Sequence, residues 1–409
     1  MYQKAEDIKN YLKSFTLDNN SKTIVDTIKI NNNEITQFVN EFWTSKQRQA
    51  SSIHEVSYRA CFKPQLPRFF IELLTEKGDI VYDPFSGRGT TVVEAGILGR
   101  KIIANDINPL SQIFAKPRMF IPSIELVKKR LAEVENNENL KADIDLSMFY
   151  HVKTESEIVA LKNSLKTTSL TAEDNIDLWI RMVSTNRLTG HSPGFFSVYT
   201  LPPNQAVTAE NQIKINAKRK QIPTYRDTKN IIIKKTKQLI KDVSKEEKSN
   251  LFTAGQTAIF LQNDARSVPE ILSESVKLTV TSPPFLDIVQ YSKDNWLRCW
   301  FNNIDSKEIE RKITMSKTVE RWVNVMGDVF KELYRITKHG GWVAFEVGEV
   351  RKGTIKLDEV VVPLGTNAGF NCFGIVINQQ EFTKTANIWG VKNNTGGTNT
   401  NRIVLFNKS

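Results

Sequence analysis

A short apolar strand, a glycine-containing turn and a helix follow one another between residues 79 and 98, and this succession constrains the fold most. Asp79 to Tyr82 has the composition of a short strand, a turn that contains Gly87 and Gly89 follows, and Val92 to Leu98 is helical in character. A second strand, Lys101 to Asn105, then ends at Asp106. Strands that alternate with helices predict a mostly parallel sheet covered on both faces. Such sheets bind their ligands at the carboxyl ends of the strands.

The turn after the first strand has the features of a ligand-binding loop. Gly87 and Gly89 allow the backbone to approach a ligand closely, and either Thr90 or Thr91 is placed to cap the helix that follows. Asp106 lies about 20 residues beyond the turn, where nucleoside-binding α/β folds hold ribose hydroxyls. A dinucleotide site is the alternative, but Val92 occupies the position of the third glycine that such a site requires.

A second candidate site follows the apolar run Val276 to Thr281, which ends abruptly in Ser282-Pro283-Pro284-Phe285. The two prolines fix φ and remove two N–H donors, so the corner is stiff and its carbonyls are free to accept. A hydroxyl and a carbonyl together suit the two hydrogens of an exocyclic amino group on a nucleobase. Phe285 is suited to stacking on a base flipped out of its helix. The alternative is a rigid turn that merely ends a strand.

Together these segments resemble the amino-methyltransferases, the DNA enzymes that methylate cytosine N4 or adenine N6. The resemblance implies S-adenosylmethionine as cofactor and Ser282, Pro283, Pro284 and Phe285 as the catalytic motif. It also implies cofactor-binding residues, with the ribose held by Asp106, the cofactor's adenine by Asp264 of Asn263-Asp264-Ala265-Arg266, and the methionine end by Asp83, Phe85, Gly87, Gly89 and Thr90. A serine before Pro-Pro is more typical of the cytosine-N4 enzymes, whereas Asp or Asn is more typical of the adenine enzymes.

The implied fold is a doubly wound, mostly parallel sheet of seven strands that ends in an antiparallel hairpin. The implied function is methyl transfer to N4 of a flipped cytosine in double-stranded DNA, in a restriction-modification system with an endonuclease or a specificity subunit as companion. Three alternatives stay open. They are adenine-N6 methylation of DNA, methylation of RNA, and an inactive DNA-binding or regulatory subunit that keeps the fold.

The chain divides into three parts by composition. Residues 1–50 are predicted to be a helical lead-in, because Ile35, Phe38, Val39 and Phe42 have helical spacing. Residues 51–115 and 252–409 form the predicted methyltransferase domain. It should contain strands near 79–82, 101–105, 258–262, 276–281 and 342–347, a short helix near 268–275, a long helix over 319–336, and a hairpin of residues 373–379 and 402–406.

Residues 116–251 are a predicted insertion, mainly helical, and the candidate DNA-recognition region. Its loop carries Phe195, Phe196 and Tyr199, and residues 210–250 hold twelve Lys or Arg against five acids. These aromatic and basic side chains suit wedging into DNA and phosphate contact. They suit equally well a buried core and a solvated helix face.

Composition limits the remaining possibilities. The net charge of +11 favours a polyanionic partner. No stretch of 18 apolar residues and no signal-peptide pattern is present, so a cytoplasmic protein without a membrane partner is expected. Cys61, Cys299 and Cys372 lie far apart and the chain has four histidines, which predicts neither a disulfide framework nor a metal site.

Overall fold

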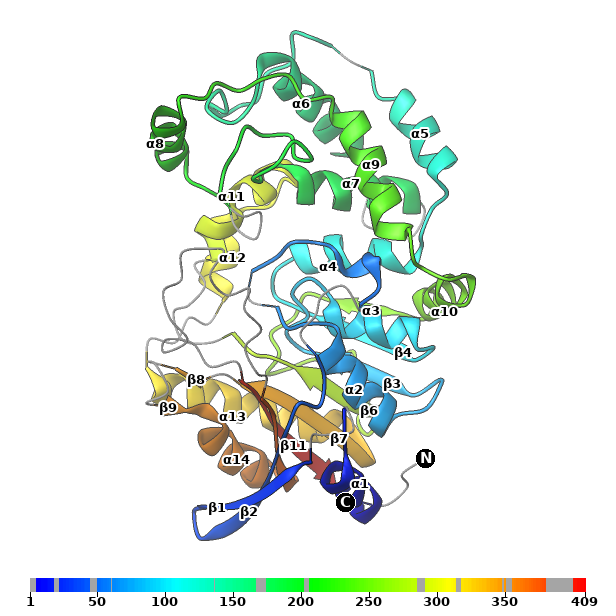
Figure 1. Ribbon diagram of the computed structural model, residues 1–409, viewed down its shortest axis with the longest axis vertical. Coiled ribbons are helices and arrows are strands. Elements are labelled where there is room, and N and C mark those ends of the chain that lie inside the picture. Colours follow the sequence, from blue (N-terminus) through cyan, green and yellow to red (C-terminus); the bar gives the residue numbers. More distant parts are fainter. Residues whose placement is uncertain are drawn as a thin grey trace.

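The protein consists of a nine-stranded sheet with its covering helices and a lobe of helices beside it (Figure 1). The computed structural model describes residues 5–17, 22–44, 50–59, 61–135, 137–166, 174–201, 206–284, 291–313, 318–347, 349–350, 355–379 and 400–409. None of the helices in these ranges is long and apolar enough to cross a membrane.

Seven strands of the sheet have the predicted arrangement, in the order β10-β11-β7-β6-β3-β4-β5. The strands β7, β6, β3, β4 and β5 are mutually parallel, and β11 is antiparallel to both β7 and β10. Their bounds are β3 Ile80–Asp83, β4 Lys101–Asn105, β5 Ile259–Leu261, β6 Val276–Thr281, β7 Thr337–Val347, β10 Asn371–Gln379 and β11 Thr400–Lys408. The doubly wound sheet with its antiparallel C-terminal hairpin is thereby confirmed, although the turn of that hairpin lies outside the described residues.

The prediction of a helical lead-in is wrong for residues 24–40. Only α1 (Ala5–Ser14) is helical, whereas β1 (Ile24–Ile30) and β2 (Asn33–Asn40) form a hairpin. The turn between them is Asn31-Asn32, and both residues have positive φ, 48° and 64°. Asparagine tolerates this conformation, which a two-residue hairpin turn of the primed type requires. Because β2 pairs in parallel with β10, the hairpin extends the sheet to nine strands.

Helices cover both faces of the sheet, as a doubly wound fold requires. One face packs against α13 (Val319–Ile336) and α14 (Leu357–Ala368), and the other packs against α2 (Gln65–Leu74), α3 (Thr90–Ile97) and α10 (Lys245–Gln256). A pair of short elements, β8 (Glu349–Val350) and β9 (Ile355–Lys356), precedes α14. Residues 268–275 form turns and not the expected short helix, and Glu274 has a φ of 55°, which lies outside the helical region.

The region between β4 and β5 is mainly helical, as predicted. It contains α4 (Leu110–Ala115), a 3₁₀ turn at Lys116–Met119, α5 (Ile124–Ala132), α6 (Val152–Lys166), α7 (Asn175–Arg187), α8 (Ala209–Arg219) and α9 (Thr228–Ile240). Two further helices, α11 (Tyr291–Phe301) and α12 (Ser306–Lys312), lie with this lobe in Figure 1. Helix α10 begins inside the proposed insertion but packs on α3, where the Asn250 amide donates to the Ile97 carbonyl at 2.9 Å.

The aromatic loop of the lobe is mostly interior. Phe196 is fully buried and Phe195 is 5% exposed, so these two rings pack within the protein. Tyr199 is half-buried, with the Arg219 guanidinium 3.7 Å from the centre of its ring. The core alternative therefore holds for the two phenylalanines.

Candidate active site

A pocket at the carboxyl ends of β3, β4 and β6 collects most of the residues predicted from sequence. The predicted site residues that line it are Asp83, Phe85, Gly87, Thr90, Asp106, Asp264, Ser282, Pro283 and Pro284. Gly89 is not a lining residue. It has a φ of 78° and starts α3, and a Cβ there would come within 2.5 Å of the Ala115 Cβ. Because Gly89 has no side chain, the start of α3 can pack closely against α4. Phe285 lies outside the described residues.

Asp83 ends β3 and is 2% exposed. Its Oδ1 accepts the Thr281 hydroxyl at 2.6 Å and the Phe85 N–H at 3.1 Å. Burial raises the pKa of this carboxyl to about 7, against the lowering effect of these hydrogen bonds. Because Thr281 ends β6, the same contact fixes the cofactor loop to the strand that leads into Ser282.

Asp106 follows β4 and faces the same pocket. Its carboxylate accepts the Gly87 N–H at 2.8 Å and the Asn108 N–H at 2.9 Å. Burial raises its pKa to about 6. Among the described residues, the hydrogen-bond donors to Asp83 and Asp106 are all uncharged. The pocket therefore contains two desolvated acids that suit a cationic ligand bearing hydroxyl groups.

The segment Asn263-Asp264 is held against β4 by Asn105, a residue that the sequence reasoning gave no role. The Asn105 side chain donates to the Asn263 carbonyl and accepts the Asn263 N–H, both at 2.9 Å. Asp264 itself is bound by Arg266, with contacts of 2.9 and 2.5 Å that lower the pKa of its carboxyl. Asp264 therefore lines the pocket while its carboxylate is bound by Arg266.

The Ser282-Pro283-Pro284 corner is fixed by a buried tryptophan. The Trp322 indole N–H of α13 donates to the Pro284 carbonyl at 3.1 Å. Trp322 lies on the long helix predicted over residues 319–336 and is 3% exposed. This hydrogen bond engages the Pro284 carbonyl and thereby fixes the backbone of the corner.

Ser282 has an acidic neighbour, Glu346, that sequence reasoning missed. Thr281 of β6 pairs with Phe345 of β7, so the next residue on each strand, Ser282 and Glu346, meet at the edge of the sheet. The Glu346 carboxylate interacts with the Ser282 hydroxyl and accepts the Asn401 amide at 3.1 Å. Burial raises the pKa of Glu346. Strand register, which the sequence does not reveal, creates this contact.

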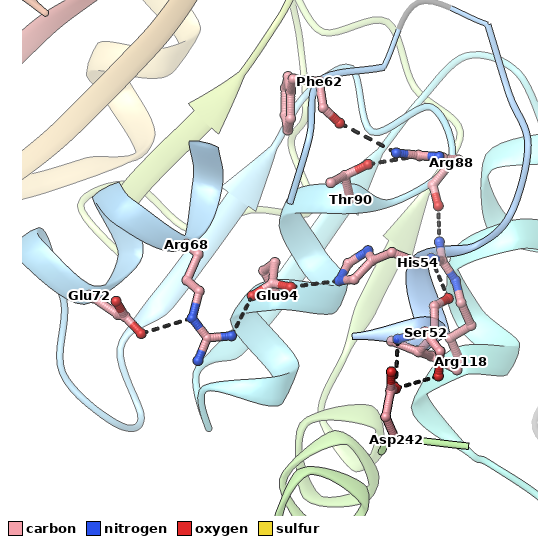
Figure 2. A network of polar contacts seen from close by, with 11 residues as sticks. Ser52, His54, Phe62, Arg68, Glu72, Arg88, Thr90, Glu94, Arg118 and Asp242 are labelled. Atoms are coloured by element: carbon pink, nitrogen blue, oxygen red, sulfur yellow. Dashed lines mark hydrogen bonds and ion pairs between the residues drawn. The ribbon is translucent and has the colours of Figure 1, made fainter. Parts of the chain in front are cut away.

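A segment of irregular backbone, residues 55–59 and 61–63, crosses the pocket, and we call it the strap. Its Tyr58, Cys61 and Phe62 line the pocket. Arg88 of the cofactor loop holds the strap, as Figure 2 shows in part. Its guanidinium donates to the Val56 carbonyl at 2.8 Å, to the Phe62 carbonyl at 3.4 Å and to the Thr90 hydroxyl at 3.1 Å.

A second buried arginine supports the first. Arg118 is fully buried and donates to the carbonyl of Arg88, to the Phe114 carbonyl at 2.9 Å and to the Ile53 carbonyl at 3.4 Å. Burial lowers its pKa to about 9, and the nearby charge of Arg88 adds to this effect. Arg118 therefore joins the cofactor loop to the turn that immediately precedes the strap.

An ion-pair network continues from this turn across α3 (Figure 2). The buried imidazole of His54 donates to the Glu94 carboxylate at 2.7 Å, and Arg68 of α2 contacts the other oxygen at 3.2 Å. Burial lowers the pKa of His54, so the ring is neutral at physiological pH. The network links α2, α3 and the 3₁₀ turn Ser52–His54 that precedes the strap.

Comparison with known proteins agrees with this geometry. Residues 2–115 match the model of the N6/N4 methyltransferase family of DNA methylases. The type II methyltransferase M.MvaI of Kocuria varians is 23% identical over 76% of this chain and 68% of its own length. The type II methyltransferase M.BsoBI of Geobacillus stearothermophilus is 24% identical over 66% of this chain and 57% of its own length.

A similarity over a shorter part of the chain is to an enzyme that methylates tRNA. A tRNA (guanine(10)-N2)-dimethyltransferase of Methanocaldococcus jannaschii is 38% identical over 15% of this chain and 18% of its own length.

The sheet and the pocket at its carboxyl edge define a doubly wound α/β domain. The family match over residues 2–115 and the two type II relatives support a relationship of this chain to the amino-methyltransferases.

Proposed function

We propose that this chain is an S-adenosylmethionine-dependent DNA methyltransferase that modifies the exocyclic N4 amino group of a flipped cytosine. One observation carries the proposal. Two desolvated carboxylates, Asp83 and Asp106, and the acceptor corner Ser282-Pro283 line the same pocket. Such an arrangement allows a cationic methyl donor and an amino group to meet at the edge of the sheet.

The pocket fits the cofactor in charge and in hydrogen-bonding capacity. S-adenosylmethionine carries a methionine amine, a sulfonium and a ribose diol, and it supplies an electrophilic methyl group. Asp83 offers a buried carboxylate to the cationic end, and Asp106 offers acceptors to the ribose hydroxyls. Phe85, Gly87 and Thr90 complete the methionine side of the pocket. Asp264 would contact adenine by sharing the carboxylate that Arg266 now occupies.

The corner suits an amino group better than a hydroxyl or a ring nitrogen. When Glu346 accepts the only hydroxyl proton of Ser282, the lone pairs of Oγ remain available to accept an N–H. The Pro283 carbonyl would accept the second N–H of the same amine. Two acceptors draw the nitrogen lone pair out of conjugation with the ring and toward the methyl group. In this proposal Phe285 stacks on the flipped base.

In this proposal the negative charge of Glu346 assists the methyl transfer. In this proposal the amino nitrogen would form a bond to the methyl carbon while the bond from that carbon to the sulfonium sulfur breaks, so the rest of the cofactor would leave as a neutral thioether. The nitrogen would become cationic and would release one proton to solvent or to a nearby acceptor. The Glu346 carboxylate lies one hydroxyl away, where its negative charge stabilises the cationic nitrogen. Serine is a weak base, so Ser282 orients the amine and does not hold the proton.

The choice of cytosine depends on Ser282 standing before Pro-Pro, which is more typical of the cytosine-N4 enzymes. The type II relatives add a restriction-modification setting, with an endonuclease or specificity subunit as companion, to the proposal.

The decisive experiment is nucleoside mass spectrometry after incubation with unmethylated DNA and methyl-labelled S-adenosylmethionine. We expect labelled N4-methylcytosine, and loss of label in Ser282→Ala. Labelled N6-methyladenine would overturn the choice of base and keep the cofactor and the family. Label in tRNA but not in DNA would move the chain toward the guanine-N2 enzymes. Absence of cofactor binding by calorimetry would favour an inactive DNA-binding subunit.

A further inference from the structure

A cleft on the other side of the strap has an excess of buried positive charge. It lies between the strap, the C-terminal end of α7 with the loop that follows, and α9, and we call it the basic cleft. Tyr58 and Cys61 of the strap line both the basic cleft and the cofactor pocket. The two cavities are therefore separated by a single segment of chain.

Positive side chains outnumber negative ones in the basic cleft. Among the described residues that line it, the lysine and arginine side chains are Lys63, Arg88, Arg187, Lys234 and Lys235, against the single acid Glu55. Arg88 is 8% exposed, and Arg187 and Lys235 are each 7% exposed. Glu55 is shared, since it lies 3.5 Å from Lys235 and 3.9 Å from Lys241 and also accepts the Gln238 amide.

Burial and neighbouring positive charge lower the pKa of two of these cations. Burial lowers the pKa of Lys235 to about 8, and the charge of Arg187 adds to this effect against the opposing charge of Glu55. Burial lowers the pKa of Arg187 to about 9, with Arg298 adding to it. Arg187 also lies flat on the Phe195 ring, 3.9 Å from its centre, so its guanidinium is held in place. Buried charges of one sign cost folding free energy unless an opposite charge joins them.

We infer that the basic cleft binds backbone phosphates of the nucleic-acid strand that carries the target base. This inference rests on the proposed function for the identity of the strand. A phosphodiester supplies the missing negative charge, and the position of the cleft, one segment away from the pocket, suits a strand whose base enters that pocket. The exposed Lys234 at this cleft is placed to meet a further phosphate.

The test compares two lysines of the basic cleft with one lysine elsewhere. Lys235→Gln removes a buried cation, Lys234→Gln removes an exposed one that cannot disturb packing, and Lys331→Gln is the control on α13, where Lys331 pairs with Asp328 at 2.9 Å. Each variant is titrated with a fluorescent DNA duplex over a range of salt concentrations, without cofactor. Each phosphate contact that is lost should lower the slope of log affinity against log salt by about 0.9.

We expect weaker duplex binding and a smaller salt slope for both cleft variants and no change for Lys331→Gln. We also expect Lys235→Gln to melt at the same or a higher temperature, because a repelled cation has been removed. Unchanged affinity and slope in both cleft variants would overturn the inference. A melting temperature that rises with inorganic phosphate, together with an unchanged duplex slope, would show a small-anion site and would overturn it too.

The outcome is independent of catalysis. Because duplex binding is measured without cofactor and without turnover, a protein that methylates nothing can still show the reduced slopes. Conversely, failure of these variants to lose affinity would leave methyl transfer, measured by mass spectrometry, untouched.

Discussion

At the scale of single residues, the pocket depends on carboxylates that the fold keeps out of water. Asp83 has a pKa near 7 in the folded chain, well above the ordinary 3.8. The folded state therefore holds this proton more tightly than the unfolded state does. The carboxylate costs stability above pH 7, and this cost disappears as the pH falls toward 4.

Asp83→Asn should remove that cost. The amide keeps an oxygen that can accept from Thr281 and Phe85, as Asp83 Oδ1 does. We expect the melting temperature at pH 8 to rise by roughly 1 °C for each kcal/mol regained, while calorimetry shows no cofactor binding. The difference in melting temperature between variant and wild type should vanish near pH 4. A lower melting temperature at pH 8 would contradict this account.

Glu346→Gln tests the contact that orients Ser282. Glutamine keeps an acceptor oxygen and loses the charge, so kcat should fall about ten-fold, or about 1.4 kcal/mol in the barrier, with little change in KM for DNA. The acidic limb of the kcat profile should also disappear, because in the wild type that limb reports protonation of Glu346.

Asn401→Ala serves as the comparison for this pH profile. It removes a hydrogen bond that lowers the pKa of Glu346, so the acidic limb should move to higher pH. An acidic limb that stays the same in Glu346→Gln would assign it to another group.

At the scale of elements, the strap and the cofactor loop behave as one unit through Arg88. Arg88→Lys keeps the charge but cannot span the Val56 and Phe62 carbonyls together with Thr90. We expect cofactor to dissociate about ten-fold faster in stopped-flow measurements, with kcat preserved at saturating cofactor.

Arg68→Lys is the matched control for the strap. Its guanidinium belongs to the same network but contacts Glu72 and Glu94 and not the strap (Figure 2). Equal acceleration of cofactor release in both variants would show a general loosening of the network.

The elements also show what sequence could predict. The strands from β3 to β7 and the C-terminal hairpin were predictable because each combines apolar residues with a clear stop. The N-terminal hairpin was not, because Ile35, Phe38 and Val39 fit the spacing of a helix as well as that of a strand. The pair Asn31-Asn32 was the signal that favoured a hairpin turn.

The candidate site divides in the same way. Asp83, Asp106 and Ser282 stand in local motifs, so the resemblance of these motifs to those of the amino-methyltransferases was enough to predict one shared site. Glu346 and Asn105 act through register across the sheet, and the strap acts through carbonyls that accept from Arg88. Neither the register of strands nor hydrogen bonds to backbone carbonyls can be recognised from the amino-acid sequence alone.

At the scale of the whole molecule, the sheet and the helical lobe share one hydrophobic core. Val92 and Leu278 near the sheet belong to the same buried cluster as Phe149 and Trp179 of the lobe. The strap joins the two parts as well. Its Val56 carbonyl accepts from Arg88 of the cofactor loop at 2.8 Å, and its Ser57 carbonyl accepts from Asn186 of α7 at 2.9 Å and from Arg298 of α11 at 3.2 Å.

This continuity predicts a single unfolding transition for the two parts. In differential scanning calorimetry, the calorimetric and van't Hoff enthalpies should agree within error. Two resolved transitions would show that lobe and sheet unfold separately, and would locate the weak point at the strap.

Because β2 pairs with β10, this part of the sheet can form only after most of the chain has been synthesised. The Asn378 side chain that accepts the N–H groups of Phe42 and Trp43 lies 336 and 335 residues beyond them. At ordinary rates of translation this delay is on the order of half a minute. Until then β2 has a free edge, and a free edge can pair with another nascent chain. Expression at low temperature with slow induction should therefore raise the yield of monodisperse protein.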